Sequence, residues 1–175
     1  VTSGVHPVWS RDGKELFSTA HPTVTGSQSN YLSPAADFSE AALETMLIQI
    51  SNAKNSRGNR ISLKGQMLIV PPDEQFNAQR IVNSSLRPGT ANNDINAVKS
   101  MGLLPDGVHV WQYLDDTDAW FIKTNAPAGL KMITRRAREF TKDNDFDTEN
   151  AKAKSTERYI VGWSDWRAAY GSAGV

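Results

Sequence analysis

The stretch AKAKSTERYIVGWS, residues 151–164, alternates between two kinds of side chain. The odd-numbered positions hold Ala151, Ala153, Ser155, Glu157, Tyr159, Val161 and Trp163, and the even-numbered positions hold Lys152, Lys154, Thr156, Arg158 and Ile160. Successive side chains of a β-strand point to opposite faces of its sheet, so this period of two predicts one long strand. The pattern also predicts that this strand has one drier face and one wet, basic face.

A second long strand is predicted just upstream, over LKMITRRAREF at 130–140. Between the two candidates lies the acidic segment DNDFDTEN at 143–150. Its four carboxylates belong to Asp143, Asp145, Asp147 and Glu149. An EF-hand calcium loop begins in this way, but it needs glycine at its sixth position and glutamate at its twelfth, where Thr148 and Lys154 stand here. The segment is therefore predicted to be the charged tip of a β-hairpin.

A helical period of 3.6 residues begins at Asp37, which with Glu40 has the spacing of a capping box. The apolar stripe of this predicted helix consists of Leu43, Met46, Leu47 and Ile50. The run QMLIV at 66–70, which two prolines end, predicts a buried strand. DEQFNAQRIVNS at 73–84 predicts a second helix. The residues expected to pack that helix are Phe76, Ala78, Ile81 and Val82.

The remaining segments are dominated by turn residues or by short alternating runs. Residues 1–36 predict an extended segment with a short strand near Glu15–Ser18. Residues 108–113 and 119–124, separated by the turn DDTD, predict a hairpin. SLRPGTANNDIN at 85–96 predicts a long exposed loop, and long loops in compact domains are often functional.

Composition narrows the classes of function. The chain has 175 residues, enough for one large domain or two small subdomains. Its 19 Lys and Arg residues equal its 19 Asp and Glu residues, so no net field draws the whole chain to nucleic acid or to anionic lipid. The absence of cysteine excludes disulfides, zinc–thiolate sites and a thiol nucleophile. The longest apolar run is too short to span a bilayer.

Catalytic motifs are absent from the sequence. There is no GxSxG elbow, no phosphate-binding GxxxxGK[ST] loop, no GxGxxG and no HExxH. The three histidines lie far apart, and His109 is expected to be a half-buried imidazole within a strand. The basic residues of the first long strand are Lys131, Arg135, Arg136 and Arg138. Two interpretations of them stay open, namely charge pairing with nearby acids and contact with phosphate.

An ordered series of short motifs resembles a family of viral proteins. The motifs are LIVPP, LRPGT followed by NNDIN, DAWFIKT, NDFDT, and ERY followed by GW. Together they are similar to tailed-phage major capsid proteins, and more narrowly to the major head subunit of Mu-like phages and prophages. The resemblance covers about Gly13 to Gly171.

The resemblance implies an α+β capsid fold, divided into an axial subdomain and a peripheral subdomain of long strands. Residues 1–36 would be an extended segment, 37–125 the axial subdomain and 126–175 the return through the peripheral subdomain. The N-terminal arm, extended loop and spine helix of the family are not recognisable here, so the chain is expected to correspond to the C-terminal portion of a subunit. It would act in the virion after synthesis in the bacterial host cytoplasm. Its partners would be copies of itself, forming an icosahedral shell around DNA that it binds without sequence specificity.

No enzymatic activity, cofactor, metal, membrane or small-molecule substrate is implied. The candidate residues for the interface between subunits are Arg87, Asn92, Asn93, Asp94, Arg135, Arg136, Asp143, Asp145, Asp147 and Glu149. For Arg87 a local pair with Asp94 is an equal alternative to a contact with a neighbouring copy. Two other functions stay open: a metal-dependent hydrolase that uses the acids at 143–149 with His109, and a nucleic-acid-binding domain that uses the bases at 131–138.

Overall fold

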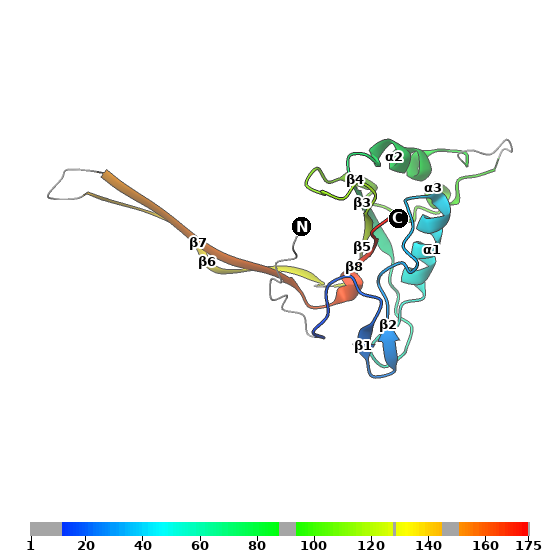
Figure 1. The fold of residues 1–175 in the computed structure, drawn as a ribbon, viewed down its shortest axis with the longest axis horizontal. Helices are drawn as coiled ribbons and strands as arrows, with labels where there is room; N and C mark the ends of the chain where they lie inside the picture. The colour runs from blue at the N-terminus through cyan, green and yellow to red at the C-terminus, as the bar shows by residue number, and fades with distance from the viewer. Residues whose placement is uncertain (1–11, 88–93, 128, 145–150, 175) are drawn as a thin grey trace.

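The computed structural model of this chain describes residues 12–87, 94–127, 129–144 and 151–174. Figure 1 shows a body of helices and sheet from which one long two-stranded arm projects. The mixture of helix and sheet agrees with the α+β expectation. The division at residues 36 and 125 and the subdomain names remain predictions.

A four-stranded sheet forms the centre of the body, in the order β4-β3-β5-β8. Its strands are β3 (Gly65–Val70), β4 (Val108–Val110), β5 (Trp120–Thr124) and β8 (Ala169–Ser172). β3 pairs in parallel with β4 and antiparallel with β5, which pairs in turn with β8. The predicted hairpin of 108–113 with 119–124 is therefore wrong. The apolar strand β3 takes the place between them, where both of its edges are hydrogen-bonded.

Two helices pack against this sheet. α1 (Glu40–Ser51) buries the whole predicted stripe, but its N-cap is Ser39 rather than Asp37, because the Ser39 side chain accepts a hydrogen bond from the Ala42 backbone N–H. α2 (Gln75–Asn83) buries Ala78, Ile81 and Val82 as predicted. Phe76, in contrast, is 72% exposed, so its predicted packing role is wrong. The short α3 (Ala97–Ser100) follows the loop at 85–96.

The first described segment contains a small hairpin of β1 (His21–Thr23) and β2 (Gly26–Gln28), and no strand at Glu15–Ser18. Gly26 has a φ of 127°, a conformation that glycine adopts without strain and that side-chain-bearing residues avoid. The turn residue thus determines where the strands form.

The side chain of Asn30 fastens this segment to the body. It is fully buried, and its Nδ2 donates to the carbonyl oxygens of Leu16 at 2.7 Å, Trp166 at 3.1 Å and Ala169 at 2.9 Å. Its Oδ1 accepts from the Ser18 backbone N–H at 3.0 Å. One side chain therefore satisfies backbone groups of two segments that lie more than 130 residues apart in the sequence.

His21 extends the same network. Its Nε2 lies 3.0 Å from Asn30 Oδ1, and its Nδ1 lies 2.6 Å from a carboxylate oxygen of Asp12. The imidazole is fully buried and stacks on the Trp166 ring at a centroid distance of 4.4 Å. Because Asn30 Oδ1 can only accept, His21 Nε2 must carry the proton of that hydrogen bond.

Replacing Asn30 with alanine should destabilise the chain strongly, because it leaves several buried carbonyls and amides without partners. We expect a loss of about 2–4 kcal/mol in the free energy of unfolding, measured by urea denaturation with circular dichroism detection. Asn59→Ala is the matched control, because Asn59 is exposed, and it should cost less than about 0.5 kcal/mol. Equal stability of the two variants would contradict the anchoring role of Asn30.

Candidate subunit interface

The arm is an antiparallel ribbon of β6 (Leu130–Asn144) and β7 (Ala151–Trp163). This confirms both predicted long strands and their pairing. The register runs from Leu130 opposite Trp163 to Asn144 opposite Ala151, with shifts between Thr134 and Arg136 and between Arg136 and Glu139. The tip was predicted at 143–150, but Asp143 and Asn144 belong to β6, and residues 145–150 lie outside the described residues. Figure 1 shows the arm reaching far from the sheet.

The register sorts the side chains of the arm onto two chemically different faces. We define the apolar face by Leu130, Met132, Phe140, Tyr159, Val161 and Trp163; the same face also carries Lys142 and Glu157. We define the basic face by Lys131, Arg136, Lys152, Lys154 and Arg158. Ile133 and Ile160 lie opposite each other among the basic residues. The two kinds of face that the alternation predicts are thus present.

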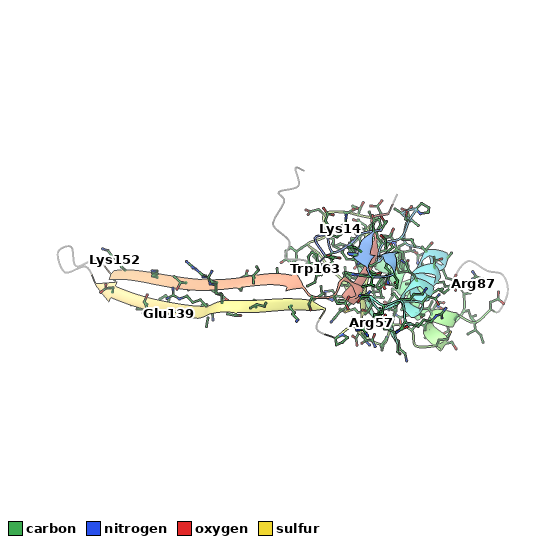
Figure 2. All side chains as sticks on the ribbon, turned by 90° about the horizontal axis from the view of Figure 1, so that it is seen from below. Lys14, Arg57, Arg87, Glu139, Lys152 and Trp163 are labelled. Carbon is green, nitrogen blue, oxygen red and sulfur yellow. The ribbon has the colours of Figure 1, made fainter. Side chains whose placement is uncertain are left out.

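The predicted dryness of one face is wrong for the single chain, however, because both faces are open to solvent over most of their length (Figure 2). On the apolar face, Met132 is 62% and Val161 is 67% exposed. Only near the root does a shallow hollow form, which Leu16, Leu130 and Met132 help to line. Contiguous exposed apolar surface of this kind is typical of protein–protein contacts.

The root of the arm is closely packed. A side chain at Gly129 would collide with Ala168, and the Ser164 backbone N–H donates to the Gly129 carbonyl at 2.8 Å. The guanidinium of Arg167 lies over the Trp166 ring at 4.2 Å and donates from Nε to the Lys54 carbonyl at 2.8 Å. These contacts fix the direction in which the arm leaves the body.

Charge is distributed unevenly between arm and body. The two strands of the arm carry eight Lys or Arg and three Asp or Glu residues, a net charge of +5. The segment between the strands adds three acids, so residues 130–163 carry +2 and the rest of the neutral chain carries −2. Arg136 pairs with Glu139 at 2.6 Å, and Asp143 lies opposite Lys152 in the register. Arg136 also lies directly opposite Arg158.

Arg87 belongs to a different region, the base of the loop at 85–96. Its backbone N–H donates to the Asp94 carbonyl at 2.9 Å, next to a bridge between Leu86 and Ile95. Its Nε donates to Glu40 Oε2 at 3.1 Å, and this hydrogen bond raises the pKa of Arg87. The sequence predicted Asp94 as the side-chain partner and did not identify Glu40, which comes from α1.

Asn96 ends that loop as a buried residue. Its Nδ2 donates to the Ile81 carbonyl at 2.6 Å, and its Oδ1 accepts from the Val98 N–H at 3.0 Å, which caps α3. The other described residues of the loop, 85–87, 94 and 95, are exposed as predicted, and only its last residue is buried.

The predicted interface residues fall into separate groups. Arg87 lies at one end of the molecule, whereas Glu139 and Lys152 mark the arm that carries Arg135, Arg136 and Asp143 at the other end (Figure 2). Asn92, Asn93, Asp145, Asp147 and Glu149 lie outside the described residues. The apolar residues of the arm are not among the predicted interface residues, although the odd positions of the alternating run already indicated Tyr159 and Val161.

The described residues give little support to the alternative function of a metal-dependent hydrolase. His109 is exposed on β4, not half-buried as expected. Within the ranges that the structure describes, no group of three or more His, Cys, Asp or Glu side chains is placed to hold a metal ion. None of the helices in those ranges is long and apolar enough to cross a membrane.

Residues 8–172 of the chain match the model of the protein family described as "Phage capsid protein". The chain belongs to this phage capsid protein family. Among solved structures it is similar to one described as the virus-like particle from Pyrococcus furiosus, with 17% sequence identity and a TM-score of 0.45. That alignment covers 75% of this chain and 49% of the other, so the chain spans about half the length of that relative. The comparison with curated proteins found no match.

Because the chain belongs to the phage capsid protein family, its role is a structural one in the virion. It also gives the arm a context, because a capsid protein works through contacts with other proteins of the shell. The candidate interface residues themselves remain predictions.

The Arg87–Glu40 pair should contribute little to the stability of the capsid chain, since the Arg87 side chain is 46% exposed. We expect Arg87→Ala to lower the free energy of unfolding by at most about 1 kcal/mol. A double-mutant cycle with Glu40→Gln should give a larger coupling energy than a cycle with Asp94→Asn. Coupling to Asp94 that exceeds coupling to Glu40 would contradict the pairing described above.

Proposed function

We propose that this chain is a structural subunit of an icosahedral phage head shell, and that it acts by self-association into capsomers around packaged DNA. The family match over residues 8–172 is the observation that carries this proposal. The motifs LIVPP, DAWFIKT and NDFDT support a narrower assignment to the major head subunit of Mu-like phages and prophages. The site of action is then the virion, after synthesis in the host cytoplasm. Catalysis, a cofactor and a small-molecule substrate have no part in this role.

The arm is the part of the chain best suited to self-association. A two-stranded ribbon is marginally stable in water by itself, so a partner surface is expected to support it. Fully burying a side chain such as methionine or valine contributes roughly 1.5–3 kcal/mol, and several such residues lie along the apolar face. We therefore propose that the apolar face packs against a neighbouring copy of the subunit.

Arg87 and Asp94 would contribute a second contact, because Arg87 lies at the other end of the molecule from the arm (Figure 2) and its backbone N–H donates to the Asp94 carbonyl. A subunit with different contact surfaces at its two ends can bind one neighbour through each of them. Such head-to-tail contacts generate closed rings when the rotation between copies closes. That property suits a protein that builds capsomers.

The substitutions Met132→Lys and Val161→Asp, made together, test the role of the apolar face. These two residues lie opposite each other, so the new charges are of opposite sign and do not repel within the ribbon. Both side chains are exposed in the single chain, so its melting temperature should stay within about 3 °C, in the range of surface substitutions. In the complete subunit, two charges buried at a contact between copies should reduce the yield of closed shells at least tenfold, as counted in negative-stain electron micrographs.

The matched control is Met101→Lys with Val24→Asp, which makes the same changes at exposed positions of the body. The control should assemble like the unaltered subunit. Normal assembly of the arm variant would refute the apolar face as a contact. Failure of the unaltered complete subunit to form shells under any condition would refute the proposed function as a whole.

A further inference from the structure

The basic face of the arm holds several cations for which the described residues provide no acidic partner. Within the described residues, Lys131, Lys154 and Arg158 make no ion pair or side-chain hydrogen bond. On the same face Arg136 is paired with Glu139, and Asp143 lies opposite Lys152. An excess of positive charge therefore remains on this face after the acids of the ribbon have been counted.

The register makes this excess costly for the isolated chain. Arg136 and Arg158 lie directly opposite each other, and like charges in this position destabilise a strand pair. The two strands carry a net charge of +5, and residues 130–163, which include the acidic segment between the strands, carry +2. An anionic partner along this face would relieve the repulsion.

The spacing of the cations indicates what kind of anion fits. Side chains on one face of a strand recur about every 6.6–6.8 Å, so the basic face is a nearly straight row rather than a pocket. The backbone of duplex DNA is a uniform line of charge, with one phosphate for about every 1.7 Å of its axis. Such a line can lie against the row in any register, whereas carboxylates of a protein would have to be placed at matching positions.

We propose that the basic face of the arm is the surface along which the backbone of double-stranded DNA lies inside the shell. This inference rests on the proposed function, because it assigns one face of the ribbon to the enclosed DNA and the other to a neighbouring subunit. The contact involves phosphates and not base edges, so it carries no sequence preference. A ribbon one strand thick thereby separates the protein contact from the nucleic-acid contact.

The test measures binding of the 175-residue chain to a fluorescent DNA duplex of random sequence, by anisotropy over a series of salt concentrations. The variant carries Lys131→Gln, Lys154→Gln and Arg158→Gln. Each phosphate contact makes the slope of log K against log salt more negative by about 0.9. The three substitutions should therefore reduce the magnitude of this slope by about 2.7. The affinity at low salt should fall at least tenfold, and two unrelated duplex sequences should bind equally well.

The matched control is Lys64→Gln, Lys123→Gln and Arg57→Gln, which removes the same charges from exposed positions of the body. It should change the slope by less than about 0.9, the value of one contact. Equal losses in variant and control would overturn the proposal, since binding would then reflect net charge alone. Absence of binding by the unaltered chain at low salt would overturn it as well.

Assembly of the complete subunit with the same three substitutions on the arm separates this proposal from the proposed function. Shells should still form, because the apolar face is intact. Loss of shells together with unchanged DNA binding would mean that the basic face meets carboxylates of another copy, and would overturn the assignment to DNA. Shells that form normally from a chain that never binds DNA would overturn this inference and leave the structural role intact.

Discussion

The buried amide of Asn30 is the interaction on which the rest of the structure depends. Its hydrogen bonds join the first described segment to the carbonyls of Trp166 and Ala169, immediately after the arm returns to the body. The Trp166 ring is in turn covered by His21 and contacted by Arg167. Polar groups in this position must all be paired, so the network permits one arrangement of the chain at the root of the arm.

Local patterns in the sequence predicted the elements whose residues are neighbours along the chain. The period of two in residues 151–164 and the stripe from Leu43 to Ile50 each reflect one face of one element, and both agree with the structure. The order of the strands in the central sheet, in contrast, does not follow from a local pattern. β3 separates β4 from β5, and this depends on contacts among segments about 40–55 residues apart, which no local period records.

Partners of polar side chains were the least predictable part of the candidate site. Arg87 and Glu40 are 47 residues apart, so spacing alone favoured the nearby Asp94. Phe76 was predicted to pack together with Ala78, Ile81 and Val82, yet α2 turns it to solvent. A prediction that assigns every apolar residue to the core cannot identify the apolar residues that are exposed. The arm shows this most clearly, because its pattern was correctly read and its exposure was not.

The close approach at Gly129 has a mechanical consequence. The thirteen residues of β7 make the arm a lever roughly 43 Å long, at about 3.3 Å per residue. A tilt of only about 5° at the root would move the far end by roughly 4 Å, about the separation of two packed side chains. Because a side chain at Gly129 would push against Ala168, the packing at this point limits the angular error of the lever. The accuracy with which the far end of the arm is positioned is then set by the fit between a glycine and an alanine at the pivot.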